Sequence, residues 1–234
     1  MHLVMLDIDG TLTQSNEVDA HCFIDAVKAV TNLKEIDSDW GSYRHVTDSG
    51  IASEIVERQL GRSITDEELL GIRRRFVESL RCAAKGDPQL FAPIPGAPRA
   101  VEALRGRRDV ALALATGGWE EAARLKLATA GFPWPEIPMA SSNDSDEREE
   151  IMILAHERAR GAYQVNAFDT RTLIGDGIWD VRASRNLGYH FIGIASGEQA
   201  HRLRAEGARL ILESYENLHE LMKRLRCAWG GPRS

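Results

Sequence analysis

The sequence has few cysteines, no long apolar run and no excess of basic residues, and each absence excludes a class of protein. Its three cysteines, Cys22, Cys82 and Cys227, lie far apart without a CxxC or zinc-type spacing, so we expect reduced thiols in a cytoplasmic protein. No apolar run approaches the length of a membrane span, and the first residues lack the basic region of a signal peptide. The formal net charge of −6 argues against nucleic acid or an anionic membrane as the main partner, because both require a basic face.

What the chain does contain is typical of a soluble globular protein. Of its 234 residues, 43% are hydrophobic and 27% are charged, which is an ordinary balance for that class. The length is sufficient for one large domain or for a core domain that carries a smaller one.

Short apolar runs alternate with helical patterns along most of the chain. The runs predicted to be buried strands are 2–6, 110–115, 172–174 and 190–194, and helical spacing occupies 98–105, 119–130, 147–160, 178–187 and 199–205. This alternation predicts an α/β fold, a doubly wound parallel sheet covered by helices on both faces. In such sheets the ligand site lies beyond the carboxyl ends of the strands, where Asp7, Thr116 and Asp176 are expected.

One long segment breaks the alternation. Between Thr11 and Pro98 the sequence is mostly helical, with helical spacing over 18–30, 50–60 and 65–84. Thr65 and Glu68 have the spacing of a capping box at the start of the last of these helices. We therefore predict a helical domain at residues 14–90 that stands over the site, and an α/β core domain formed by residues 1–13 and 91–234.

Asp7 and Asp9 follow the first strand and are predicted to point the same way, with Gly10 directly after them. Two carboxylates this close repel each other, so we expect a cation beside them. Mg²⁺ suits the position because it prefers few carboxylates, several waters and a phosphate oxygen. A carboxylate can also attack phosphorus and form an acyl phosphate. A solvated Asx-type turn is the alternative, whereas an EF-hand calcium loop is excluded because its later ligands are missing.

Two further motifs follow apolar strands. Thr116, Gly117 and Gly118 open a helix, where backbone N–H groups and the Thr hydroxyl favour an anion, although a plain helix N-cap is compatible with the same residues. Asp176 lies in a tight Gly-Asp-Gly turn, and Asp180 follows one helical turn later on the same face. In the alternative explanation, both acids are present only because a helix N-terminus favours negative charge. This explains one of the two acids well, but it is less convincing for the acid in the tight Gly-Asp-Gly turn.

Arg148 breaks a local electrostatic rule. It lies within the otherwise acidic first turn of the helix predicted at 147–160, where the helix dipole disfavours a cation. Such a departure often marks a functional position. Pairing with Asp146 or Glu149 is the alternative explanation.

In chain order, these pieces resemble the haloacid dehalogenase superfamily of phosphohydrolases, in its branch of phosphoglycolate phosphatases and phosphoglucomutases. Residues 7–13 (Asp-Ile-Asp-Gly-Thr-Leu-Thr) resemble the first motif, the strand ending in Thr116 resembles the second, and residues 175–180 resemble the acidic fourth. The likeness covers residues 1–13 and 96–212, and the helical insertion resembles that family's cap domain.

The resemblance implies a role for each of these residues. Asp7 attacks phosphorus and becomes phosphorylated, and Asp9 protonates the leaving group and then activates water. Mg²⁺ is held by Asp7, by the backbone carbonyl of Asp9 and by Asp176, while Asp180 ligates through water or orients the shell. Thr116 holds phosphoryl oxygens. Because the branches that cleave carbon–halogen and carbon–phosphorus bonds lack the second acid, Asp9 also argues against a dehalogenase.

The third motif departs from the family pattern. The family usually places a lysine near the start of the helix before the fourth motif, but this sequence has no lysine between Lys126 and Lys223. We therefore assign the position to Arg148. An arginine can neutralise a phosphorylated Asp7, but it stays charged and presents a different fork of donors.

The segment 40–50 lies between two predicted helices and resembles the substrate-specificity loop of capped family members. The candidates to reach the leaving group are Tyr43, Arg44, His45, Thr47 and Asp48. Among these we predict that Arg44 and His45 bind substrate, together with Gly117. In the alternative explanation, Asp48 or Ser49 caps the helix that begins near Ile51.

We therefore predict an enzyme that hydrolyses the phosphate monoester of a small metabolite, using a covalent aspartyl phosphate on Asp7 and one Mg²⁺. A phosphomutase of the same architecture is the nearest alternative, in which Asp7 returns its phosphoryl group to a sugar phosphate. A third alternative is a member that accepts or binds a phosphoryl group without turnover, against which the adjacent acid Asp9 argues. We expect a monomer or homodimer, and the motifs do not name the substrate.

Overall fold

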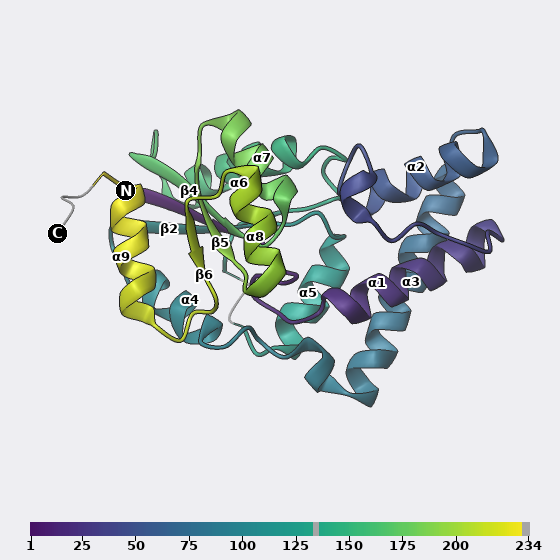
Figure 1. The fold of residues 1–234 in the computed structure, drawn as a ribbon, viewed down its shortest axis with the longest axis horizontal. Coiled ribbons are helices and arrows are strands. Elements are labelled where there is room, and N and C mark those ends of the chain that lie inside the picture. The colour runs from purple at the N-terminus through teal and green to yellow at the C-terminus, as the bar shows by residue number, and fades with distance from the viewer. Residues whose placement is uncertain (133–135, 231–234) are drawn as a thin grey trace.

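The computed structural model describes residues 1–132 and 136–230, and within them six parallel strands form one sheet in the order β3-β2-β1-β4-β5-β6 (Figure 1). The strands are β1 (His2–Leu6), β2 (Val110–Ala115), β3 (Met139–Ala140), β4 (Thr170–Gly175), β5 (His190–Ile194) and β6 (Leu210–Leu212). All neighbours in the sheet pair in parallel. The predicted fold class is confirmed, and β3 and β6 are additions that the sequence pattern did not indicate.

Helices cover both faces of the sheet, which explains why β2 and residues 3–6 of β1 are continuous apolar runs rather than alternating patterns. The helices are α4 (Ala97–Arg105), α5 (Glu120–Thr129), α6 (Arg148–Tyr163), α7 (Ile178–Leu187), α8 (Gly197–Glu206) and α9 (Leu218–Ala228). On one face, Val4 and Leu6 of β1 belong to a buried cluster with side chains of α4, α5 and α9. On the other face, Leu3 and Met5 pack with side chains of α6 and α7.

The order of the strands fixes where a ligand can bind. From β1 the chain builds β2 and β3 on one side, and then crosses to build β4, β5 and β6 on the other. The direction in which strands are added to the sheet therefore reverses between β1 and β4, and in such sheets the ligand crevice opens at the carboxyl ends of the strands beside this point. Leu6 lies opposite Ile174 in the register, and the N–H of Asp7 donates to the carbonyl of Ile174 at 3.0 Å.

The segment between β1 and α4 folds into a separate group of helices beside the sheet, visible on the right of Figure 1. They are α1 (Asn16–Thr31), the 3₁₀ turn η1 (Trp40–Ser42), α2 (Asp48–Leu60), α3 (Asp66–Gly86) and the 3₁₀ turn η2 (Pro88–Phe91). We call α1, η1, α2 and α3 the α1–α3 unit. Phe23 and Phe76 lie in its buried cluster, which also takes in Trp119 and Ala122 at the start of α5. The division into a core domain and a domain at 14–90 stays a prediction.

Helix α3 shows how the helices of this unit are specified. The predicted capping box is present, since Glu68 N donates to Thr65 Oγ1 at 3.2 Å and Thr65 N donates to Glu68 Oε2 at 3.0 Å. One face of α3 is buried through Ile72, Phe76 and Leu80. In the described part of the chain, no helix has the length and apolar character needed to cross a membrane.

The α1–α3 unit approaches the backbone of the core closely at Gly117, in the loop after β2. Asp48 N donates to Gly117 O at 2.8 Å. A Cβ atom added to Gly117 would lie 2.6 Å from the carbonyl oxygen of Val46, a separation that real Cβ atoms do not adopt. Only glycine therefore allows the two backbones to meet here.

We expect Gly117→Ala to destabilise the protein, because the new methyl group forces the backbone at Val46 away from the loop after β2. Overpacking of this kind costs about 1–3 kcal/mol, which urea unfolding measures directly. Gly118→Ala is the matched control, since its Cβ would meet its nearest neighbours at 3.5 Å, an ordinary contact. Equal stability of the two variants would contradict the close approach.

Candidate active site

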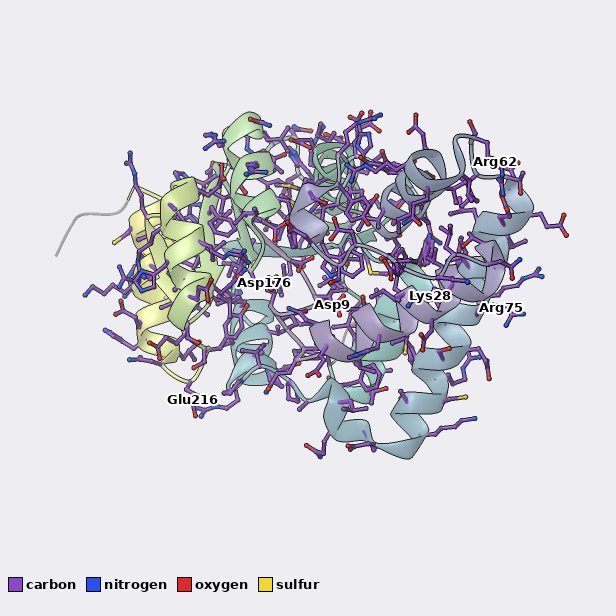
Figure 2. The ribbon with its side chains drawn as sticks, turned by 45° about the vertical axis from the view of Figure 1, so that its right-hand side comes forward. Asp9, Lys28, Arg62, Arg75, Asp176 and Glu216 are labelled. Carbon is purple, nitrogen blue, oxygen red and sulfur yellow. The ribbon has the colours of Figure 1, made fainter. Side chains whose placement is uncertain are left out.

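The carboxyl end of β1 opens into a pocket of about 430 Å³ between the sheet and the α1–α3 unit. Figure 2 shows Asp9 and Asp176 at this junction. The residues lining the pocket that the sequence analysis singled out are Asp7, Asp9, Thr47, Asp48, Thr116, Gly117, Gly118 and Asp176. Residues that the chain separates by more than 160 positions therefore meet in one cavity.

Arg148, the first residue of α6, contacts two of the predicted carboxylates. Its Nη2 donates to Asp7 Oδ1 at 2.9 Å and to Asp180 Oδ1 at 2.7 Å, and its Nε donates to Asp180 Oδ1 at 2.9 Å. The guanidinium is buried, as is Asp180. The alternative pairing with Asp146 or Glu149 is not found among the described contacts, so the cation at the start of this helix is explained by the site.

Asp7, Asp176 and Asp180 form a cluster that has the chemistry of a metal site. Each offers one carboxylate oxygen, and these oxygens lie within 4.8 Å of one another. Gly10 makes room for this approach: its φ is +68°, and a Cβ there would lie 2.0 Å from Asp176 Oδ2. Hard carboxylate oxygens are the ligands that Mg²⁺ prefers.

The charges of this cluster are not balanced by the protein alone. Burial raises the pKa of Asp7 to about 7; the Arg148 guanidinium opposes this shift, and Asp180 and Asp9 add to it. Burial also raises the pKa of Asp176 well above its usual value, and Asp7 and Asp180 raise it further. The cluster thus has three carboxylates and one guanidinium, which pairs with Asp7 and Asp180 only, and a bound divalent cation would restore the ionised forms.

Asp180 serves two roles at the start of α7. Its Oδ2 accepts from Gly177 N at 3.3 Å, which is the helix N-terminal role considered from the sequence, while its Oδ1 accepts from Arg148.

Thr116 does not cap α5, whose N-cap is Trp119. Thr116 is buried, and its Oγ1 accepts from Gly118 N at 3.1 Å. That bond leaves the hydroxyl hydrogen free to donate into the pocket.

Lys126 is a site residue that the sequence analysis missed. It lies on α5 with its side chain 1% exposed, and its Nζ donates to Asp9 Oδ2 at 2.7 Å and pairs with Asp19 of α1. Burial works against its charge, but Asp19, Asp9 and Asp48 together raise its pKa above the usual value. The available signal was its spacing, because Lys126 falls on the apolar face of α5 between Ala123 and Leu127.

The segment that begins α2 is hydrogen-bonded to the core beside the predicted catalytic residues. Thr47 Oγ1 donates to Asp146 O at 2.9 Å, Ser49 N donates to Ser142 Oγ at 3.0 Å, and Trp119 N donates to Asp48 Oδ2 at 2.8 Å. The N-cap of α2 is Thr47, which accepts from Gly50 N. The alternative in which Asp48 or Ser49 caps this helix is therefore wrong.

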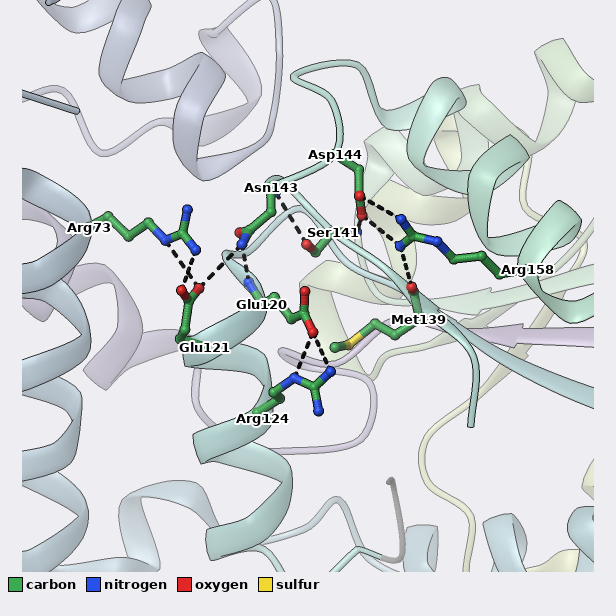
Figure 3. A network of polar contacts seen from close by, with 9 residues as sticks. All are labelled: Arg73, Glu120, Glu121, Arg124, Met139, Ser141, Asn143, Asp144 and Arg158. Atoms are coloured by element: carbon green, nitrogen blue, oxygen red, sulfur yellow. Dashed lines mark hydrogen bonds and ion pairs between the residues drawn. The ribbon is translucent and has the colours of Figure 1, made fainter. Parts of the chain in front are cut away.

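A second link joins the unit to the core at the start of α5 (Figure 3). Arg73 of α3 pairs with Glu121, and Asn143 Nδ2 also donates to Glu121. The side-chain oxygen of Asn143 accepts from Glu120 N at 3.0 Å. The first turn of α5 is thus held from the helical unit and from the loop after β3.

The two predicted substrate ligands of the specificity loop lie elsewhere. Arg44 is exposed and His45 is half-buried, and neither is among the described residues that line the pocket. The backbone N–H of Arg44 donates to Glu54 Oε2 at 2.7 Å. Four other residues of the same loop line the pocket, namely Trp40, Val46, Thr47 and Asp48. Substrate roles for Arg44, His45 and Gly117 stay predictions.

Comparison with known proteins agrees with this geometry. The model of the haloacid dehalogenase-like hydrolase family matches residues 1–188, a span that contains the whole carboxylate cluster and Arg148. The chain belongs to this family. No curated protein sequence matches it.

Solved structures share the fold of this haloacid dehalogenase-like hydrolase. CbbY from Rhodobacter sphaeroides in complex with xylulose-1,5-bisphosphate is 19% identical, with a TM-score of 0.69 over 92% of this chain and 95% of that one. A predicted phosphoglycolate phosphatase from Haemophilus somnus is 17% identical, with a TM-score of 0.63 over 94% and 97%. A putative β-phosphoglucomutase from Bacteroides vulgatus is 18% identical, with a TM-score of 0.68 over 98% and 90%. At these identities the likeness is one of fold.

We expect Lys126→Met to destabilise this hydrolase, because Asp9 and Asp19 would lose their shared cation. Both carboxylates keep about a fifth of their side-chain surface exposed, at 23% and 20%, so we expect about 3 kcal/mol, the lower end for a broken buried pair. Unfolding in urea at pH 7.5 measures this. The loss should shrink towards pH 5, where the freed carboxylate of Asp19, whose pKa burial raises to about 6, takes up a proton. Lys85→Met, which alters an exposed lysine of α3, is the control, and an equal effect of both substitutions would contradict a buried ion cluster.

Proposed function

We propose that this hydrolase removes the phosphoryl group from a small phosphate monoester through a covalent aspartyl phosphate on Asp7, with Mg²⁺ as its cofactor. The observation that supports this most strongly is the position of Asp7, buried at the switch point of the sheet between Arg148 and two further carboxylates. Arg148 orients Asp7 Oδ1, while the nearest donor to Oδ2 is the Thr11 hydroxyl at 3.4 Å. One carboxylate oxygen is therefore held, and the other is only weakly engaged.

Asp7, Asp176 and the backbone carbonyl of Asp9 would hold the Mg²⁺, with Asp180 as a direct or water-mediated ligand. Bound there, the ion would neutralise the carboxylates and polarise the phosphoryl oxygens. The oxygen-only donor set and the excess of negative charge over Arg148 both support this assignment.

Two groups of the protein suit the oxygens of the transferred phosphoryl group. Nη1 of Arg148 is buried and has no hydrogen-bond partner among the described residues, and a phosphoryl oxygen carried on Asp7 would supply the missing acceptor. The hydroxyl of Thr116 can donate from the carboxyl end of the neighbouring strand β2. Donors that are fixed before the reaction stabilise the charge of the transition state without reorganisation.

Asp9 is suited to move the proton. In the first step an oxygen of Asp7 forms a bond to phosphorus, the bond from phosphorus to the leaving oxygen breaks, and Asp9 gives its proton to that oxygen. In the second step water attacks phosphorus, the bond to Asp7 breaks, and Asp9 takes up the proton of the water. Ser15 Oγ at 2.5 Å and Lys126 Nζ at 2.7 Å fix the two oxygens of this carboxylate.

We expect Asp7→Asn to reduce phosphate release from p-nitrophenyl phosphate by at least about 10³-fold, because the amide is a poor nucleophile. Removal of Mg²⁺ with EDTA should abolish the wild-type activity, and added Mg²⁺ should restore it. Asp169→Asn, at a surface carboxylate that pairs with the N-terminus, is the control. If the wild type and Asp7→Asn prove equally inactive over a broad panel of phosphate monoesters, the proposed function is wrong. Transfer of the phosphoryl group to a second sugar phosphate, in place of its release, would identify a phosphomutase.

The role of Arg148 is tested by two substitutions. We expect Arg148→Met to lower kcat by about 10²-fold or more, the usual effect of losing a preorganised donor, while Arg148→Lys should retain part of the activity because it keeps the charge. Arg160→Met, which removes a cation that pairs with Glu157 on the same helix, should leave kcat nearly unchanged. Full activity of a folded Arg148→Met variant would show that another cation serves the phosphoryl group.

A further inference from the structure

The pocket has a second end, away from Arg148, where the leaving group of a substrate would lie. Its walls come mainly from the α1–α3 unit and comprise Asp19, Phe23, Trp40, Asp48 and, from α7, Trp179. Among the described residues that line the pocket, none is a lysine or an arginine. The end that would receive the leaving group is therefore acidic and aromatic.

Asp48 lies next to the position where the ester bond would break. A point 1.5 Å from the Cα of Gly118, where a Cβ would stand, is 3.5 Å from Thr116 Oγ1, 3.6 Å from Asp48 Oδ2 and 3.9 Å from Asp9 Oδ2. The predicted phosphoryl ligand, the predicted proton donor and the carboxylate of Asp48 thus surround one small volume. An atom one or two bonds beyond the leaving oxygen would meet Asp48.

The charge at this end disfavours an anion. Lys126 pairs with Asp9 and Asp19, and Asp48 lies close enough to raise the pKa of that lysine. Three carboxylates therefore share one ammonium. Burial disfavours the charge of Asp48 and raises its pKa well above the usual value, and the nearby charge of Asp19 raises it further, so a donor from a ligand would favour the ionised form. A second phosphate or a carboxylate on the leaving group would add to this repulsion, whereas a donor would relieve it.

The aromatic walls fit the same ligand. Trp40 and Phe23 pack edge to face at 5.9 Å between ring centroids, and Trp179 faces the pocket from the core side. Ring faces attract ammonium groups and accept the apolar carbons of a short chain. Ring faces repel a carboxylate, for which only the ring edges and the indole N–H groups offer contacts.

We propose that the leaving group of the substrate carries a hydrogen-bond donor, an ammonium or a hydroxyl, close to the ester oxygen and no second anion, and that Asp48 recognises this donor. The inference rests on the proposed phosphatase function and adds to it the chemical class of substrate. Amino-alcohol and polyol monophosphates belong to the class, and carboxylated or doubly phosphorylated leaving groups do not.

A series of four small esters tests the proposal, because its members differ mainly in the group beyond the first carbon. They are 2-aminoethyl phosphate, 2-hydroxyethyl phosphate, ethyl phosphate and carboxymethyl phosphate, each assayed with Mg²⁺. We expect kcat/KM for the better of the two donor-bearing esters to exceed that for ethyl phosphate by about 10-fold and that for carboxymethyl phosphate by about 100-fold, since the donor pairs with a buried carboxylate and the carboxylate is repelled. The ratio of kcat/KM for the 2-aminoethyl ester to that for the 2-hydroxyethyl ester then shows whether the site prefers an ammonium or a hydroxyl donor. Equal or better turnover of carboxymethyl phosphate would overturn the inference.

Asp48→Asn identifies the residue responsible. The amide keeps the shape of the side chain and an oxygen for Trp119 N, but it loses the charge. We expect the preference for the donor-bearing ester over carboxymethyl phosphate to fall by about 10-fold or more. Glu57→Gln removes the same charge from an exposed position of the same helix, α2, and should leave the preference unchanged. Unaltered discrimination in Asp48→Asn, or an equal loss in Glu57→Gln, contradicts the role of Asp48.

Two further measurements separate this inference from the proposed function. p-Nitrophenyl phosphate has an activated leaving group, so its hydrolysis reports on the catalytic residues whatever the preference of the pocket. Hydrolysis of this ester without a preference for donor-bearing esters overturns the inference alone, and no phosphate release from any ester overturns both proposals. Calorimetric binding to the inactive Asp7→Asn protein with Mg²⁺ should rank 2-aminoethyl or 2-hydroxyethyl phosphate above carboxymethyl phosphate, and the reverse order would again contradict it.

Discussion

Two buried cations hold together a group of carboxylates that would otherwise repel one another, and the arrangement of the site depends on these contacts. Arg148 joins Asp7 to Asp180, and Lys126 joins Asp9 to Asp19. Both cations project from helices that follow strands of the sheet. Breaking a buried ion pair costs far more stability than an exposed pair contributes. The positions of α5 and α6 relative to the sheet are therefore tied to the carboxylates with which Lys126 and Arg148 pair.

The part of the site that the sequence predicted is the part that local patterns encode. An apolar run followed by a polar turn places Asp7, Thr116 and Asp176 at strand ends, and parallel pairing then brings those ends to one edge of the sheet. Arg148 could be singled out because it is locally unfavourable at a helix N-terminus. Its partners could not be chosen from the residues alone, since Asp7 is 141 positions away and Asp146 and Glu149 are close by.

The features that were missed depend on long-range contacts or on very short elements. Strands β3 and β6 have two and three residues, too few for a periodic signal. Lys126 pairs with Asp9, which lies 117 positions earlier in the chain, and in the sequence Lys126 is an ordinary lysine within a helix. Asp48 was a candidate N-cap of its own helix, but its carboxylate accepts from Trp119, the N-cap residue of α5, 71 positions later. Tertiary contacts decided each of these cases.

The opposite charge preference of the two ends of the pocket gives a physical reason for the way a substrate would be oriented. At the core end, Arg148 and a bound Mg²⁺ would compensate three carboxylates and favour the dianionic phosphoryl group. At the other end, Asp19 and Asp48 exceed the charge of Lys126, so the same phosphoryl group would be repelled. An ester with a donor on its leaving group matches both ends in only one direction. The hydrogen bonds of Thr47, Asp48 and Ser49 to the core fix the second end of the pocket beside the first. The contact between the α1–α3 unit and the loop at Gly117 therefore holds the residues that would select the substrate next to the residues that would react with it.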